Sequence, residues 1–189
     1  MSSPQKAKGS SYEREVAKFL SDLYGEPFVR VPNSGAFIGG SNQHRKQKLS
    51  ENQIKGFKGD IIPPDSWTKF NAEAKSYADF PFHLVLTSEC KQLNTWINQL
   101  MAVAEDGDLN ILFMKFNRKG RYIAVQYKST YHLQTYIKYS SKLLGTWIVA
   151  EMDDFFKYNK DLLKQYSHYQ TDTKSIQINA LDIFPLTIN

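Results

Sequence analysis

The amino-acid sequence predicts an α/β fold in which a mixed central β-sheet is flanked by α-helices. Segments with the three-and-four spacing of amphipathic helices alternate with short segments rich in β-branched and aromatic residues. Their order is a helix, several strands, a helix, more strands and a final helix, which is typical of a sheet covered by helices. With 189 residues, the chain can fill one core well. We therefore expect one domain spanning residues 1–189.

The first predicted element is an amphipathic α-helix over residues 11–24. Apolar side chains recur there every three or four positions, Ser10 or Ser11 is available as the N-cap, and Gly25 marks the stop. A short strand over residues 28–31 follows.

A long basic, glycine-rich loop at about residues 33–59 is the next predicted feature. Structureless loops longer than about 15 residues are usually functional or disordered in compact domains. Residues 60–62 then predict a strand, and the Pro-Pro-Asp-Ser sequence at 63–66 is a strong turn signal. We expect this strand to form a β-hairpin with a second strand within residues 67–77.

The second half of the chain carries the clearest helical pattern. Ser88 is available as the N-cap of a helix that ends near Gly107, with its apolar residues on one face. The later predicted elements are a hairpin of strands 109–116 and 121–127, a strand over 146–150 and a helix over 152–166. We describe the chain from about residue 128 onward as a C-terminal extension.

Composition restricts the protein class only mildly. A net charge of +5 and a pI near 9.1 favour polyanionic partners without excluding other classes. The single cysteine, Cys90, excludes an internal disulfide and is compatible with a reducing compartment. The N-terminus has no apolar signal region, and no run approaches the roughly 20 apolar residues that span a bilayer. We expect a cytoplasmic protein without membrane association.

Three carboxylates and one lysine form a candidate catalytic set: Glu13, Asp60, Glu73 and Lys75. Side chains two residues apart on a strand lie on the same face of a sheet, so Glu73 and Lys75 are expected to share one site. Helical phase places Glu13, rather than Glu15, over the edge of the apolar face of its helix. These are the groups needed to hold a divalent cation against a phosphodiester.

Two other motifs compete for the same roles. Pro64-Asp65 supplies a Pro-Asp pair, and Glu89-Cys90-Lys91 supplies a second Glu-x-Lys. Asp65 follows two prolines in a predicted turn, where aspartate is common for conformational reasons. Glu89 lies in the first turn of a predicted helix, where an acidic residue interacts favourably with the helix dipole. We interpret both as structural.

Four segments occur in a fixed order: Lys8-Gly9-Ser10-Ser11-Tyr12-Glu13-Arg14-Glu15, Val29-Arg30-Val31-Pro32, Gly59-Asp60 and Glu73-Ala74-Lys75. This ordered set resembles the PD-(D/E)XK nuclease superfamily, and within it the archaeal-type Holliday junction resolvases, including those carried by phages. The resemblance implies a restriction-endonuclease-like core. In such a core a helix supplies Glu13, and two adjacent strands supply Asp60 and the Glu73-Ala74-Lys75 motif.

The chemistry of hard cations then favours Mg²⁺, with Mn²⁺ as a substitute. Mg²⁺ prefers oxygen ligands, and Asp60, Glu73, the main-chain carbonyl of Ala74 and, through water, Glu13 can supply them. Lys75 would orient the attacking water or stabilise negative charge in the transition state. The four histidines show no metal-ligand spacing, which argues against zinc. No small-molecule cofactor is expected.

Further residues are candidates for DNA binding. Arg30 matches an arginine that contacts a phosphate in the family, and a role at a strand edge is equally compatible. Ser34 could contact DNA or serve only a turn. The basic side chains of the long loop could bind the DNA backbone or remain solvated. They are Arg45, Lys46, Lys48, Lys55 and Lys58.

We therefore predict a Mg²⁺-dependent DNA endonuclease that resolves four-way junctions by paired nicks. The resemblance also implies a homodimer, because symmetric cutting of two strands needs two active sites, and a location in the host cytoplasm if a phage encodes the chain. One alternative is a phage or restriction-type nuclease acting on other branched or duplex DNA. Another is a non-catalytic DNA-binding protein, against which the intact set of four side chains argues.

Overall fold

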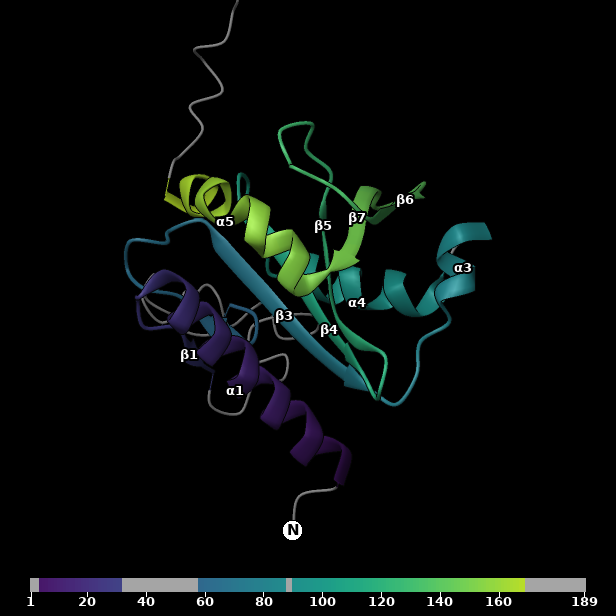
Figure 1. Ribbon diagram of the computed structural model, residues 1–189, viewed down its shortest axis with the longest axis horizontal. Coiled ribbons are helices and arrows are strands. Elements are labelled where there is room, and N and C mark those ends of the chain that lie inside the picture. Colours follow the sequence, from purple (N-terminus) through teal and green to yellow (C-terminus); the bar gives the residue numbers. More distant parts are fainter. Residues whose placement is uncertain (1–3, 32–57, 88–89, 169–189) are drawn as a thin grey trace, which may run out of the picture.

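A five-stranded mixed β-sheet forms the centre of the molecule (Figure 1). The computed structural model describes residues 4–31, 58–87 and 90–168. Across the sheet the strands are β3 (Phe70–Tyr77), β4 (Leu109–Phe116), β5 (Gly120–Gln126), β7 (Gly145–Glu151) and β6 (Tyr136–Ser141). The β3–β4 pair is parallel, and the other three pairs are antiparallel. The predicted α/β class with a mixed sheet is confirmed.

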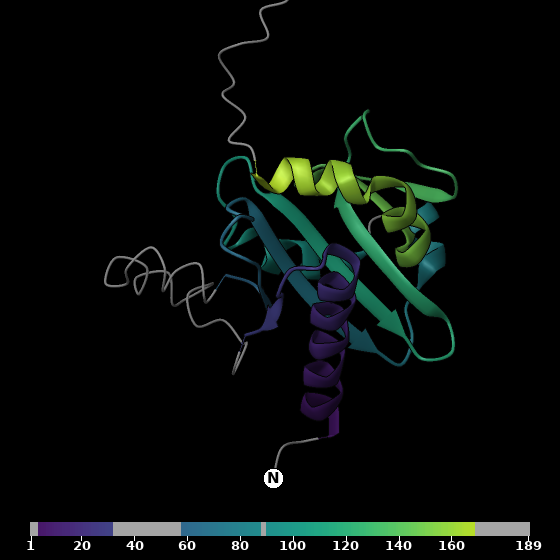
Figure 2. The same ribbon diagram turned by 60° about the vertical axis from the view of Figure 1, so that its left-hand side comes forward.

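Helices cover both faces of this sheet. Helices α1 (Pro4–Tyr24) and α5 (Met152–His168) pack on one face, and α3 (Phe82–Thr87) and α4 (Lys91–Met101) pack on the other. Figure 2 shows α1 and α5 together on one side of the sheet. In the described part of the chain, no helix has both the length and the apolar character needed to cross a membrane.

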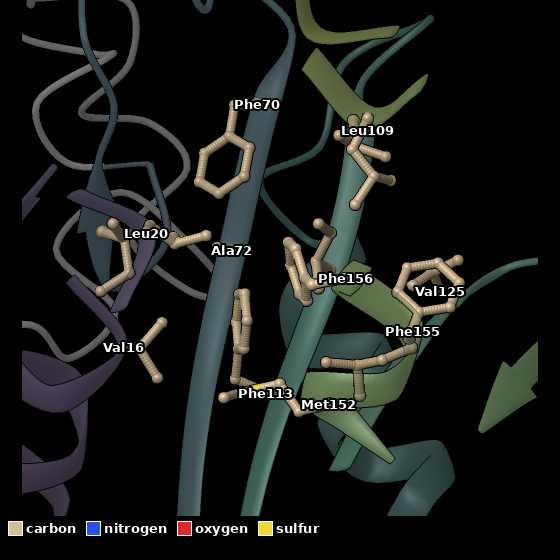
Figure 3. Packing of buried hydrophobic residues seen from close by; sticks show 14 of the residues in the cluster. Val16, Leu20, Phe70, Ala72, Leu109, Phe113, Val125, Met152, Phe155 and Phe156 are labelled. Carbon is tan, nitrogen blue, oxygen red and sulfur yellow. The ribbon is translucent and has the colours of Figure 1, made fainter. Parts of the chain in front are cut away.

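Alternating side chains of the strands divide the core into two clusters. Phe113 of β4 packs towards α5, where its ring stacks against Phe156 with centroids 5.9 Å apart. Leu112, the preceding residue, belongs to the cluster under α4. Figure 3 shows the first cluster, in which Val16 and Leu20 of α1 face Ala72 of β3. Because strand side chains alternate between faces, β4 contributes side chains to both clusters and is buried on both faces of the sheet.

Helix α1 begins earlier than predicted. It starts at Pro4, so the predicted start at residue 11 with Ser10 or Ser11 as the N-cap is wrong. Proline is tolerated in the first turn of a helix, and the helix continues through Gly9 despite its low helix propensity. The predicted stop is confirmed, because Gly25 has φ +66° and its N–H donates to the Ser21 carbonyl at 2.9 Å.

The predicted hairpin between residues 60–62 and 67–77 is wrong. Strand β2 (Ile61–Ile62) pairs antiparallel with β1 (Val29–Arg30) in a separate two-stranded sheet. Strand β3 pairs with β4 instead. The Pro-Pro-Asp-Ser turn reverses the chain as expected, but turn chemistry does not specify which backbone a strand will pair with.

Helix α4 is shorter than predicted. Its N-cap is Cys90, which makes no side-chain cap hydrogen bond, and the helix ends at Met101 rather than near Gly107. The predicted cap Ser88 therefore precedes the helix, and both Ser88 and Glu89 lie outside the described residues. The predicted helix continued to near Gly107. In the structure the Asp108 carboxylate accepts a hydrogen bond from the Glu105 N–H at 2.6 Å, and this local bond stabilises a turn there in place of the helix.

The β4–β5 hairpin, strand β7 and helix α5 follow the prediction. The β4–β5 hairpin turns through Arg118 and Gly120, which have φ +58° and +102°. Strand β7 and helix α5 also form as predicted. Helix α3 and strand β6 were not predicted. Because β6 and β7 pair within the central sheet, residues 136–151 are part of the same sheet as β3.

Candidate active site

Three carboxylates that are distant in sequence lie together at the β3 edge of the central sheet. Glu13 comes from α1, Asp60 directly precedes β2, and Glu73 lies on β3. All three are buried, with exposed fractions of 8%, 7% and 6%. Both Glu13 and Glu73 act electrostatically on Asp60. Carboxylates are rarely buried unless partners offset the cost of burying their charge. The partners of these three side chains therefore decide how the cluster is stabilised.

Main-chain hydrogen bonds fix Asp60 against β3. The Asp60 N–H donates to the Ala72 carbonyl at 2.8 Å, and the Ala74 N–H donates to Asp60 Oδ2 at 2.9 Å. On the other side, the Val31 N–H donates to the Asp60 carbonyl at 2.9 Å. Asp60 therefore has a defined position relative to both β1 and β3, although β2 and β3 do not form a hairpin.

Burial makes ionisation of Asp60 costly. Loss of solvation, and next the charge of Glu73, raise the pKa of Asp60 to about 7, and the charge of Glu13 adds to this. The hydrogen bond from the Ala74 N–H and the charge of Lys75 act in the opposite direction. A carboxyl pKa raised by burial and by neighbouring carboxylates is typical of catalytic and metal-binding sites.

Glu73 and Lys75 lie on one face of β3, as strand alternation predicted. Lys75 Nζ donates to Glu73 Oε1 at 2.6 Å. Lys75 is itself largely covered, with 14% of its side chain exposed. The ammonium group is therefore held beside the carboxylate cluster.

Glu13 is the more buried of the two glutamates between which helical phase distinguished, Glu13 and Glu15. Glu13 Oε2 accepts a hydrogen bond from Arg30 Nε at 2.5 Å, and both side chains are mostly buried. Glu15 instead pairs with Lys115 and Arg121, with 37% of its side chain exposed. Arg30 ends β1, and its guanidinium is the partner of the Glu13 carboxylate.

The comparison of the whole chain with known protein families identifies the family to which it belongs. A family model described as "Phage putative PDDEXK endonuclease" matches residues 4–173. The chain belongs to this family. No curated protein and no solved structure gives a match. Membership in the phage PDDEXK endonuclease family confirms the resemblance to the PD-(D/E)XK superfamily, and it implies that the chain is a nuclease with DNA as its substrate.

The family match extends well beyond the four candidate side chains. It includes β6, β7 and α5, which belong to the same sheet and core as β3. The phage PDDEXK endonuclease region therefore covers both the site and the later part of the chain. The competing Asp65 is exposed in the turn between β2 and β3, in agreement with its interpretation as a turn residue.

In this endonuclease two carboxylates and one main-chain carbonyl form a set of oxygen donors that suits a hard cation. No group of three His, Cys, Asp or Glu side chains within the described ranges is arranged to hold a metal ion. However, the N–H and C=O of one strand residue point to the same edge, so the Ala74 carbonyl lies on the edge where its N–H contacts Asp60. Asp60, Glu73 and this carbonyl offer oxygen ligands of the kind that Mg²⁺ prefers.

Lys58 has a different environment from the one predicted for a DNA-binding loop residue. It is buried, with an exposed fraction of 5%, and its ammonium group pairs with the Asp108 carboxylate and, at 3.5 Å, with Glu105 Oε2. We therefore correct its assignment to a structural ion pair that holds the chain before Asp60. The other predicted loop candidates, Ser34, Arg45, Lys46, Lys48 and Lys55, lie outside the described residues.

Gly59 brings the chain close to β3 immediately before Asp60. It has φ +68°, and a Cβ atom placed there would lie 2.2 Å from the Ala72 carbonyl oxygen. Only glycine adopts this backbone conformation without strain and also permits the approach.

Gly59→Ala is expected to lower the free energy of unfolding by about 2–4 kcal/mol, because left-handed strain and a forced backbone shift add together. Gly25→Ala is the matched control, since Gly25 has φ +66° but no atom within 4 Å of the added Cβ. That variant should lose only about 1–2 kcal/mol from strain. Urea titration measures both values, and equal losses would show that the contact with Ala72 is unimportant.

Sequence reasoning missed one residue of this site. Gln99, on α4, accepts a hydrogen bond from Lys75 Nζ at 2.8 Å through Oε1. A lone exposed glutamine on an amphipathic helix gives no signal in the sequence. Its contact with Lys75 depends on the packing of α4 against the sheet.

Proposed function

We propose that this chain is a Mg²⁺-dependent, structure-specific DNA endonuclease that resolves four-way junctions by paired nicks. One observation carries the nuclease part of the proposal. In a member of an endonuclease family, Glu13, Asp60 and Glu73 are buried together beside Lys75 at a sheet edge. The preference for junctions rests on the likeness of the ordered motifs to archaeal-type resolvases.

Asp60, Glu73 and the Ala74 carbonyl would hold the cation, with Glu13 acting through water. Bound there, a divalent cation supplies charge that polarises the scissile phosphate and activates a water molecule. The raised pKa of Asp60 supports this assignment, because a cation relieves the repulsion that makes its ionised form costly. Mn²⁺ offers the same preference for oxygen ligands and would substitute.

The protein side chains would then position the reactants. Lys75, as a compact cation with three N–H donors, would orient the attacking water or donate to the phosphate as negative charge develops. Arg30 pairs with Glu13 and holds its carboxylate in place in this structure, and its guanidinium could also contact a phosphate near the cut. Glu13 and Arg30 would thus help to locate the substrate relative to Asp60.

DNA binding by the basic segment is also part of the proposal. The described residues that flank this segment lie at the site, since the Val31 N–H bonds to the Asp60 carbonyl and Lys58 precedes Gly59. We assign contacts with the DNA backbone to Ser34, Arg45, Lys46, Lys48 and Lys55. Such contacts make affinity fall steeply with salt, so the salt dependence of junction binding in Ca²⁺ tests them.

A second candidate function fits the family equally well. A phage endonuclease could cut other branched or specific duplex DNA with the same site, because one fold supports many substrates. A homodimer is proposed with junction resolution, since two sites are needed for symmetric nicks. A monomer that nicks one strand would favour the second candidate.

One experiment separates these candidates. Matched four-way junction, flap, nicked and linear duplex DNAs are incubated with the protein in Mg²⁺, Mn²⁺, Ca²⁺ or EDTA, and the cuts are mapped. Paired symmetric nicks confined to the junction are expected in Mg²⁺ and Mn²⁺. Equal cutting of linear duplex would reject junction specificity, and cutting in EDTA would reject metal dependence.

A further inference from the structure

The ammonium group of Lys75 has two acceptors from different elements. Glu73 Oε1, on the same strand, lies 2.6 Å from Nζ, and Gln99 Oε1, on α4, lies 2.8 Å from it. A lysine ammonium carries three N–H donors. Among the described residues two of them have acceptors, which leaves a third to act on a water molecule or a phosphate.

Helix α4 places Gln99 firmly. The buried face of α4, formed by Leu93, Trp96, Ile97 and Leu100, packs against the sheet. Gln99 directly precedes Leu100, so its backbone position is set by that packing. Tyr77, which follows Lys75 on the same face of β3, packs against Trp96 with ring centroids 4.8 Å apart. The strand that carries Lys75 and the helix that carries Gln99 are therefore tied together near the site.

The two acceptors differ in what cation binding would do to them. Glu73 is a proposed ligand of the cation, so binding would draw its charge away from Lys75 and bring positive charge near the ammonium group. Gln99 is neutral and keeps its acceptor oxygen. Lysine has no acceptor, so the amide oxygen, and not the nitrogen, must face Nζ. Gln99 is thus the partner that can hold Lys75 when Glu73 is otherwise engaged.

We propose that Gln99 is a positioning residue that holds the Lys75 ammonium at the cleavage site. This inference rests on the proposed function of the same site and adds a residue from α4 to it. Without Gln99, the flexible lysine stem would regain rotamer freedom and the ammonium would leave its position once Glu73 binds a cation.

Three variants test this role: Gln99→Leu removes the acceptor, Gln99→Glu keeps one, and Asn98→Leu changes the exposed neighbour on the same helix. The first readout needs neither metal nor activity. The rate of acetylation of each lysine is measured by mass spectrometry in EDTA. Lys75 should be acetylated faster in Gln99→Leu than in wild type and at the wild-type rate in Asn98→Leu. In Gln99→Glu it should be acetylated no faster than in wild type, because a carboxylate keeps the acceptor and favours the unreactive ammonium form.

The second readout is single-turnover cleavage at saturating protein, together with DNA affinity in Ca²⁺. Gln99→Leu should lower the saturated rate by about 10–100-fold, the size of effect expected when a reacting group is misplaced. Its affinity for DNA should stay within about threefold, a difference of less than about 1 kcal/mol. Gln99→Glu should retain a saturated rate closer to wild type than Gln99→Leu does.

Failure of this inference is distinguishable from failure of the proposed function. Unchanged Lys75 acetylation in Gln99→Leu, or a saturated rate equal to that of Asn98→Leu, would overturn the role of Gln99 while wild-type cleavage stands. Absence of any cleavage by the wild type would reject the proposed function. The acetylation measurement would still decide whether Gln99 holds Lys75.

Discussion

Replacing Asp60 or Glu73 by alanine is expected to lower DNA cleavage by at least about 10³-fold, a loss of about 4 kcal/mol of transition-state stabilisation. In the proposed site each carboxylate would supply oxygen ligands, and no neighbouring side chain among the described residues is placed to replace them. Glu13 is paired with Arg30, and the Ala74 carbonyl belongs to the main chain. Loss of either ligand should therefore remove the cation from its position against the phosphate.

The measurement is single-turnover cleavage of a four-way junction in Mg²⁺, with junction affinity measured separately in Ca²⁺. Affinity should change by less than about tenfold, because phosphate contacts by basic side chains dominate binding. Asp65→Ala is the matched control, since Asp65 is an exposed aspartate in the nearby turn. It should cut at the wild-type rate. Normal cutting by both Asp60→Ala and Glu73→Ala would place the active site elsewhere in the chain.

The parts of this site that sequence predicted depend on local geometry. Strand alternation is a property of the backbone, so Glu73 and Lys75 could be placed on one face from their spacing alone. Helical phase likewise placed Glu13, and not Glu15, beside the core. The preference for Asp60 over Asp65 followed from turn chemistry, which is also local.

The parts that sequence could not predict depend on partners distant along the chain. The pairing of β2 with β1 involves residues separated by more than 30 positions, and no local signal reports it. Lys58 lies in a basic, glycine-rich part of the sequence that is typical of a solvated loop, but its side chain pairs with Asp108, which is a buried partner 50 positions away. Gln99 meets Lys75 only because β3 and α4 pack against each other. These contacts require the tertiary structure.

Asp60→Asn is expected to stabilise the metal-free protein at pH 8 by about 2–4 kcal/mol, because asparagine avoids the cost of a buried charge. Asparagine has nearly the same shape as aspartate, and its side-chain oxygen can still accept the hydrogen bond from the Ala74 N–H. Its amide N–H groups could also donate to the Glu73 carboxylate. The variant should therefore fold normally while losing cleavage.

The pH dependence fixes the sign of this effect. The folded-state pKa of Asp60 is raised to about 7, whereas an unfolded aspartate has a pKa of about 3.9. Between these values the folded state binds more protons than the unfolded state, so the contribution of Asp60 to stability falls as the pH rises from about 4 to about 7. The advantage of Asp60→Asn should be near zero at pH 4 and should reach its full size above pH 7.

Urea titrations of both proteins in EDTA at several pH values measure this difference, with Asp65→Asn as the exposed control. Added Mg²⁺ should reduce the difference between the two proteins. A cation at 100 times its Kd stabilises the wild type by about 3 kcal/mol, and Asp60→Asn, lacking one anionic ligand, should gain much less. A difference that is constant from pH 4 to pH 8 would show that Asp60 is ionised without penalty in the folded protein. Equal stabilisation of both proteins by Mg²⁺ would show that Asp60 is not a ligand. In the expected pattern, the buried charge of Asp60 destabilises the metal-free protein and a bound cation offsets that cost. This pattern would link the stability of the chain directly to its proposed chemistry.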